Sequence, residues 1–286
     1  MTMAVSKTVP LFLLLESFLL VHCRLIDMSF PYEKNMVTWP GFLPFNISLF
    51  YRGPVGKAPF MIAFDIILNE HTGTHIDAPL HFAEGKASVD EIPPENLIAK
   101  AIVVNISEQV TKDRDYALTV DDLKNWERKH GVIPDGCVVF VLTGLGKYWG
   151  DFDKYMGTTT KTNGSMATPD FHWPGFHKDA AQWLVDNRKI KGIGIDSRSF
   201  DPGESKSFPA HQIFLGNNIY GLESVANIEE LPVKGATVYV MPMKIKGGSG
   251  GPTRIIAQTE PAGRGSRQTN SIVVIAILFL MTMLFN

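Results

Sequence analysis

Residues 69–85 read NEHTGTHIDAPLHFAEG and bring three of the chain's eight histidines around one aspartate. The three are His71, His75 and His81, and the aspartate is Asp77. Two interpretations are open at this point: a metal site, or a polar surface loop that is rich in histidine. The spacing of these side chains decides how well each interpretation fits.

Alternate side chains of an extended segment share one face, so His75 and Asp77 should project together, about 6.6 Å apart. In a straight strand His71 would lie about 13 Å from His75, too far to share one ion. Gly73 disfavours a helix and allows a bend that returns His71 to the other two, leaving room for an ion or a water. Imidazole and carboxylate ligands suit Zn²⁺ or Mn²⁺, and His81 would act beside the ion as general acid or base.

Both ends of the chain are apolar and point to export. Residues 1–23 have a lysine, a leucine-rich run and a cleavage-like end, as a secretory signal does. Residues 271–286 form an apolar tail behind a polar spacer, 256–270, which is the pattern of a GPI-anchor signal. The alternative is a short membrane-spanning tail. The sequence therefore predicts one folded domain over 24–255, held at the extracellular face of the cell membrane through its C-terminal segment.

Three Asn-x-Ser triplets, at Asn46, Asn105 and Asn163, support passage through the secretory pathway and predict a glycoprotein. Of the two cysteines, Cys23 lies at the predicted cleavage point, and Cys137 is expected to be a buried small apolar residue. The net charge is −2 and no basic stripe is present, so nucleic acid is excluded as an expected partner.

Short apolar or β-branched segments bounded by glycine, proline or polar residues predict strands. These are residues 61–68, 101–107, 137–144, 190–196 and 236–245. Helical patterns are fewer and cover residues 119–131, 177–189 and 217–231. The glycine-rich segment 246–254 is expected to be a flexible loop. This mixture of strands and helices predicts an α/β or α+β fold.

Four segments together carry a family resemblance: LIDMSFPYEKNMVTWPG (25–41), HTGTHIDAPLHF (71–82), AAQWL with the following IGID (180–196), and SRSFDPGESKSFPAHQIFLGNNIYGLES (197–224). In this order they resemble the metal-dependent cyclase family, which includes bacterial-type kynurenine formamidase and isatin hydrolase. The resemblance spans residues 25–245. It implies a single-domain swivelling β/β/α fold that assembles as a homodimer or a larger homo-oligomer.

The resemblance also implies a fuller site. The metal ligands it implies are His71, His75, Asp77, His211 and Glu223, with one or two ions. In a two-ion arrangement, Asp77 bridges to a second ion held with His211 and Glu223, and His81 is the catalytic acid or base. Formamidase-like members of the family have Glu where this chain has Glu223, whereas isatin hydrolases have Gln. The glutamate therefore favours the formamidase-like arrangement.

The implied reaction is hydrolysis of the amide C–N bond of a small molecule. The substrate would be an N-formyl arylamine such as N-formylkynurenine, an intermediate of tryptophan breakdown, or a strained cyclic amide such as isatin. Apolar walls for a flat aromatic substrate are expected from one or two of Trp39, Phe42, Phe45, Phe82 and Phe208. Two alternatives remain: a hydrolase of another cyclic amide or lactone, and a cell-surface binding protein on the same scaffold without turnover.

Overall fold

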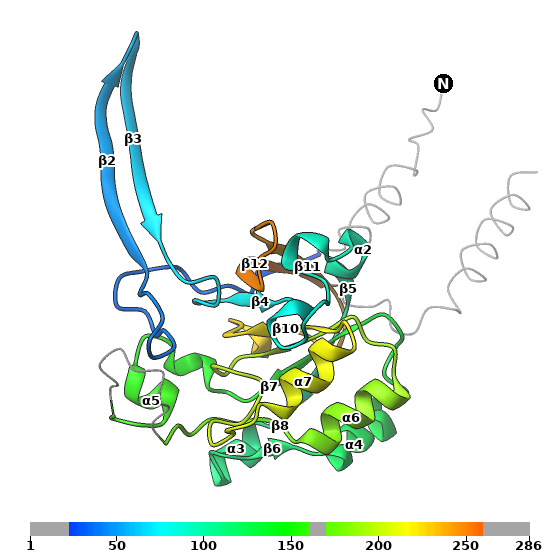
Figure 1. The fold of residues 1–286 in the computed structure, drawn as a ribbon. Coiled ribbons are helices and arrows are strands. Elements are labelled where there is room, and N and C mark those ends of the chain that lie inside the picture. The colour runs from blue at the N-terminus through cyan, green and yellow to red at the C-terminus, as the bar shows by residue number, and fades with distance from the viewer. Residues whose placement is uncertain (1–22, 161–169, 260–286) are drawn as a thin grey trace, which may run out of the picture. The chain divides into compact units, whose positions relative to one another are not determined.

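A curled eight-stranded sheet forms the centre of the protein (Figure 1). The structure, a computed structural model, describes residues 23–160 and 170–259. The strand order is β1-β12-β11-β5-β7-β9-β10-β4, and β4 pairs additionally with β12. The strands are β1 (Leu25–Asp27), β4 (His75–Asp77), β5 (Ile98–Asn105), β7 (Val138–Leu142), β9 (Gly192–Ile195), β10 (Tyr220–Glu223), β11 (Lys234–Pro242) and β12 (Gly250–Thr259). Because β4 joins β10 to β12, the sheet closes on itself, and a mixed α/β architecture is observed as predicted.

The central strands β5, β7, β9 and β10 run parallel and are buried on both faces. Alternate residues of β7 belong to different core clusters: Val139 and Val141 face the helices, whereas Val138 and Phe140 face the interior of the curled sheet. Parallel strands that are covered on both sides read as continuous apolar segments. This is why the segments at 101–107, 137–144 and 190–196 could be recognised as strands.

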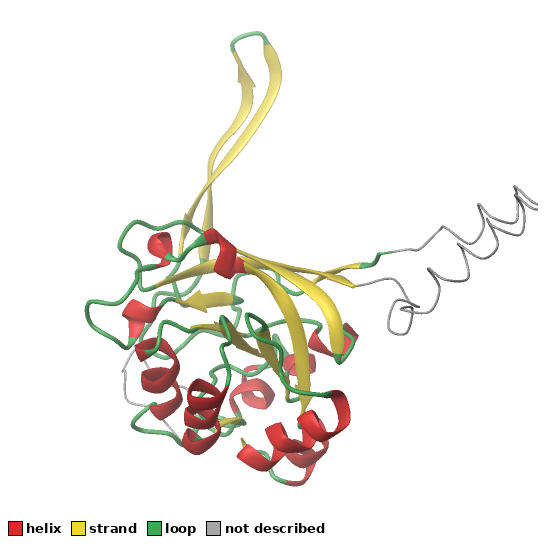
Figure 2. Ribbon diagram, turned by 90° about the vertical axis from the view of Figure 1, so that its right-hand side faces the viewer, coloured by secondary structure: helices red, strands yellow, loops and turns green. Residues whose placement is uncertain are grey.

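Helices cover one side of the sheet (Figures 1 and 2). They include α3 (Ser107–Lys112), α4 (Val120–His130), α5 (Phe152–Met156), α6 (Lys178–Asn187) and α7 (Pro209–Gly216). The short helix α2 (Pro94–Leu97) lies apart from them and packs Leu97 against the core cluster inside the curled sheet. The predicted helices at 119–131 and 177–189 are confirmed as α4 and α6. Thr119 caps α4 as expected, since its side-chain oxygen accepts from the backbone N–H of Asp122 while the Asp122 carboxylate accepts from the N–H of Thr119.

The predicted helix at 217–231 is wrong. Helix α7 lies earlier, with Pro209 in its first turn, and residues Tyr220–Glu223 form the buried strand β10. Asn218, Ser224 and Asn227 have positive φ angles, which interrupt a helical path through this segment. Burial of β10 between β9 and β4 therefore prevails over the local helical pattern.

The predicted flexible loop at 246–254 is also wrong beyond its first residues, because Gly250 begins strand β12. A Cβ atom at Gly250 would lie 2.5 Å from His71 Cε1 and 2.5 Å from the carbonyl oxygen of Ile76. Glycine is needed here for the close approach of β12 to β4, and the glycine-rich sequence reflects packing rather than mobility.

Strands β2 (Asn46–Val55) and β3 (Ala58–Ile67) form a long antiparallel hairpin that projects from the sheet and helices (Figures 1 and 2). The strand predicted at 61–68 is confirmed as part of β3, whereas β2 was not predicted. We call residues 46–67 the arm. Its exposed large apolar side chains are Leu49, Phe50, Val55, Phe60, Met61, Ile62, Phe64, Ile66 and Ile67. An apolar two-stranded ribbon of this kind covers no core of its own.

Cys137 is fully buried, as predicted, and burial raises the pKa of its thiol to about 12. Asn46 and Asn105 are exposed, whereas Asn163 lies outside the described residues. The predicted signal, 1–23, lies outside them except for Cys23, and so does the apolar tail at 271–286. Within the described ranges, no helix combines the length and the apolar character needed to cross a membrane.

Candidate metal centre and active-site cavity

Three parts of the fold bring the predicted site residues together. Strand β4 and its flanks supply the histidines and the aspartate of residues 71–81, α7 supplies His211, and the end of β10 supplies Glu223. The antiparallel pairing of β4 with β10 places Glu223 opposite His75. All six predicted residues, His71, His75, Asp77, His81, His211 and Glu223, line one cavity.

The predicted bend at Gly73 is confirmed, since this residue has a φ angle of +69°. The bend lets His71 Nδ1 lie 2.7 Å from Asp77 Oδ1. However, a Cβ atom at Gly73 would lie 2.8 Å from Met36 Cε and 3.0 Å from the ring of Tyr32. The glycine therefore permits close packing of these side chains, and the expected room for an ion or water at this point is wrong.

Hydrogen bonds orient two of the imidazoles toward the carboxylates. The Nδ1 atom of His75 contacts the Gly73 carbonyl at 2.9 Å, and that of His211 contacts Asp201 at 2.6 Å. In each ring this leaves Nε2 facing inward. His75 Nε2 lies 3.3 Å from Asp77 and 3.4 Å from Glu223, and His211 Nε2 lies 3.2 Å and 3.3 Å from the same two carboxylates. Histidines that bind a metal through one ring nitrogen typically make such a hydrogen bond with the other, here Nδ1.

Asp77 lies at the centre of the cluster, and its buried Oδ2 atom meets no hydrogen-bond criterion with a described residue, although His211 Nε2 lies 3.2 Å from it. Burial by itself would raise the pKa of Asp77, but His81, His71 and His211 hold it well below its usual range. Two groups that include Asp77 have ligand atoms close enough to hold one ion: His71–Asp77–His81 and His75–Asp77–Glu223. A buried carboxylate with imidazole nitrogens around it fits a divalent cation of the Zn²⁺ or Mn²⁺ type.

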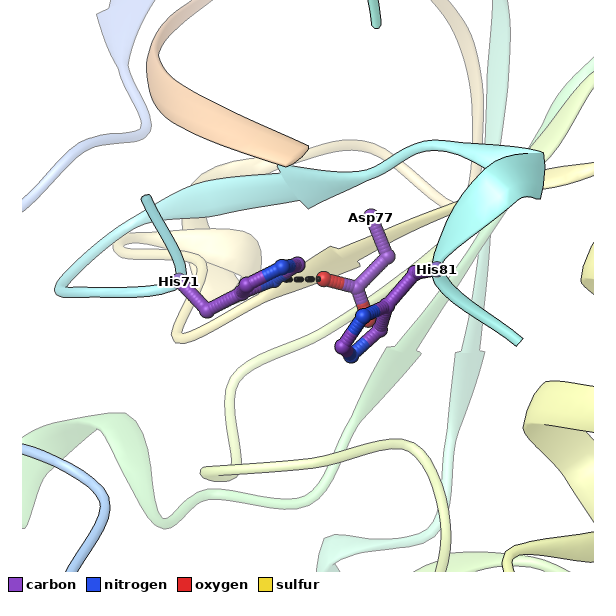
Figure 3. Close-up of side chains that lie close together, drawn as sticks. All are labelled: His71, Asp77 and His81. Atoms are coloured by element: carbon purple, nitrogen blue, oxygen red, sulfur yellow. Dashed lines mark hydrogen bonds and ion pairs between the residues drawn. The ribbon is translucent and has the colours of Figure 1, made fainter. Parts of the chain in front are cut away.

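His81 ends a single 3₁₀ turn, Pro79–His81, and stacks on His71 with ring centroids 3.9 Å apart. Figure 3 shows both rings beside the carboxylate of Asp77. Burial and the neighbouring histidines lower the pKa of His81 to about 4, although Asp77 acts in the opposite direction. Burial also disfavours charge on His71, but the adjacent Asp77 and Glu70 raise its pKa to about 9. The two stacked rings thus differ in proton affinity, and a cation bound by His71 would displace the proton from its ring.

The cavity has a volume of about 180 Å³. Trp39, Phe42, Phe82 and Phe208 line it, so four of the five aromatic residues expected as candidates for a wall are in place. Phe45 instead is buried against Tyr32, with ring centroids 5.7 Å apart. An apolar cavity with a few convergent polar groups is the usual form of a small-molecule site.

Sequence reasoning missed Arg198 and Asp201, both buried in the loop between β9 and α7. Asp201 accepts hydrogen bonds from the backbone N–H groups of Ala210 and His211 and so fixes the start of α7. Arg198 donates to Glu223. In α/β proteins, ligands bind at the carboxyl ends of parallel strands. The charged residues that follow the apolar segment 192–195 could therefore have indicated that this loop contributes to the site.

Residues 26–202 match the sequence model of the Cyclase family. An isatin hydrolase from Roseibium aggregatum is 36% identical over 70% of this chain and 75% of its own length. A kynurenine formamidase from Salinibacter ruber is 26% identical over 83% of this chain and 98% of its own. Among solved structures, isatin hydrolase A from Ralstonia solanacearum superposes with a TM-score of 0.74 at 32% identity, covering 91% of this chain and 100% of that one. The fold expected from the family resemblance is thereby confirmed.

Proposed function

Because this chain belongs to the Cyclase family, we propose that it is a metal-dependent hydrolase that cleaves the amide C–N bond of a small aromatic substrate. The observation that carries the proposal is the convergence of four histidines, Asp77 and Glu223 on one cavity with aromatic walls. The greater identity to an isatin hydrolase favours a cyclic amide, whereas Glu223, by the family pattern, favours an N-formyl arylamine. Both substrate types are therefore the first to test.

The proposed metal ligands are His71, His75, Asp77, His211 and Glu223. When bound, a Zn²⁺ or Mn²⁺ ion supplies Lewis acidity toward an amide carbonyl and lowers the pKa of water. The protein orients the substrate and the metal ligands. The aromatic walls hold the flat substrate, and the hydrogen-bonded imidazoles keep their coordinating nitrogens turned inward.

We assign proton transfer to His81. Its ring is neutral at pH 7 because its pKa is lowered to about 4, so Nδ1 or Nε2 can accept a proton from the attacking water. The same imidazolium then donates that proton to the leaving nitrogen. Stacking on His71 places the His81 ring beside Asp77.

The deciding experiment is hydrolysis of isatin and of N-formylkynurenine by the purified protein, first after chelation and then with Zn²⁺ or Mn²⁺ restored. We expect turnover only in the restored samples. A metal-loaded protein that is inert toward these and a broader panel of amides and lactones would refute the enzymatic proposal. It would favour the alternative of a surface binding protein on the same scaffold.

We also propose that the chain forms a homodimer through the arm. Nine large apolar side chains are exposed there, and contiguous exposed apolar surface of this kind marks protein interfaces. A two-stranded ribbon without a covering layer is marginal in water, so a second copy that covers the arm would stabilise it.

The charged double variant Phe50→Glu/Phe60→Glu should dissociate this dimer. Each phenylalanine contributes about 1.5–3 kcal/mol when buried, so the two changes should weaken association at least ~100-fold. Light scattering coupled to gel filtration would measure the mass. Val132→Glu is the control, because Val132 is as exposed as Phe50, at 69%, but lies outside the arm. A wild-type protein of monomeric mass would refute the proposal.

For localisation, we propose entry into the secretory pathway and attachment to the extracellular face of the membrane by a GPI anchor or a short C-terminal tail. The exposed asparagines of two sequons, Asn46 and Asn105, support glycosylation. Release of the protein from cells by a phosphatidylinositol-specific phospholipase would identify the lipid anchor, and retention would identify the tail.

A further inference from the structure

Arg198 is a buried cation at the wall of the active-site cavity, and the proposed chemistry does not use it. Only 3% of its surface is exposed. Its Nη1 atom donates to Glu223 Oε2 at 3.1 Å, and Nη2 donates to the carbonyl oxygen of His71 at 3.3 Å. The guanidinium lies over the ring of Trp39, 5.4 Å from its centroid.

The hydrogen-bonding capacity of this guanidinium is only partly used. Arginine has five N–H donors, and here two hydrogen bonds to described residues are formed, while the buried Nε atom has no partner among them. Burying a guanidinium with unused donors is unfavourable unless another group completes its pairing. A role limited to holding Glu223 would need only one of the five donors.

The rest of the cavity defines what that other group can be. The volume of about 180 Å³ is close to the ~150 Å³ at which an apolar cavity accepts one benzene ring. Arg198 is the only lysine or arginine among the lining residues that the structure describes. Its permanent positive charge therefore favours an anionic substituent of an aromatic ring at the N–H donors that Glu223 does not occupy.

We propose that Arg198 selects aromatic amides whose ring bears a carboxylate next to the amide nitrogen. This rests on the proposed function of the site. The planar guanidinium matches a carboxylate, and it lies over the ring of Trp39. For such a substrate, N-formylanthranilate, water adds across the C–N bond and yields formate and anthranilate. The ring carboxylate is unchanged in the reaction and serves only for recognition.

The test compares N-formylanthranilate with formanilide, which lacks the carboxylate but has the same scissile bond. We expect the metal-loaded wild type to favour N-formylanthranilate about 10- to 100-fold in kcat/KM, mainly through KM, as a charge-assisted hydrogen bond would give. Arg198→Met should reduce this ratio to about one, and Arg198→Lys should retain part of it. Using the ratio cancels any effect of the variants on metal binding that is common to both substrates.

A binding measurement provides a readout that does not depend on turnover. By calorimetry, anthranilate should bind to the wild type and lose affinity in Arg198→Met, whereas neutral aniline should bind both equally. If both substrates are hydrolysed with a ratio that Arg198→Met leaves unchanged, Arg198 only holds Glu223 and the inference is overturned. If neither substrate is hydrolysed but anthranilate binds in an Arg198-dependent way, the anion site stands and the proposed function fails.

Discussion

Replacing Asp77 with asparagine is expected to remove the bound metal and abolish turnover. Asp77 is the residue that both candidate ion-holding groups of the cavity share, and its carboxylate is buried among the imidazoles. Asparagine keeps the shape but removes the negative charge, which is what offsets a dication in a buried site. Loss of a partner that merely orients a ligand costs about 10- to 100-fold in metal affinity, so loss of Asp77 itself should exceed ~100-fold.

Metal content per chain after dialysis, measured by mass spectrometry, checks this expectation directly. Asp186→Asn is the matched control, because Asp186 is exposed on α6 and its carboxylate accepts a hydrogen bond from Gln182 in the same helix, outside the cavity-lining set. The control should retain both metal and turnover. Circular dichroism of Asp77→Asn should still show the folded state. A variant that keeps its full metal content would remove Asp77 from the set of ligands.

The second large effect is expected for His81→Gln, which should keep its metal but lose turnover about 10²- to 10⁴-fold, the usual contribution of a general acid or base. Glutamine cannot exchange a proton at neutral pH, yet it fills much of the space of the imidazole that stacks on His71. Both isatin and N-formylkynurenine should show the loss, because each requires a proton at its leaving nitrogen.

Two measurements on His81→Gln distinguish a proton carrier from a ligand, since His81 also belongs to the ion-holding group with His71 and Asp77. If the variant loses its metal, His81 is a ligand and the acid–base assignment is wrong. If it keeps both its metal and its turnover, His81 has neither role. His130→Gln is the control, because His130 packs against Trp126 in α4, outside the cavity-lining set.

The local part of the site could be predicted because its information lies within eleven residues. The spacing of His75 and Asp77 and the glycine at position 73 determine a strand and a bend, and both are found. His211 and Glu223 could be added only through the family resemblance, because the pairing of β4 with β10 joins positions almost 150 residues apart. No local pattern encodes such a contact.

The mistakes share one physical cause, which is that tertiary packing outweighed local preference. Residues 220–223 form a central strand because they fill the space between β9 and β4, although the segment 217–231 has a helical pattern. The glycines near 250 look like a loop but allow a strand to approach His71. Arg198 looks like an ordinary loop charge, and only its burial beside Glu223 shows that it lines the cavity.

The double pairing of β4 has a consequence for how the protein folds and opens. This three-residue strand is the only link that closes the sheet in the described part of the chain, and it bears two of the proposed ligands, His75 and Asp77. Closure of the ring and assembly of the site are therefore one event. A ligand that binds only the closed state stabilises it by mass action. The decrease in hydrogen-exchange rate at the β4 amides on adding metal would thus measure how much the ion stabilises the closed sheet.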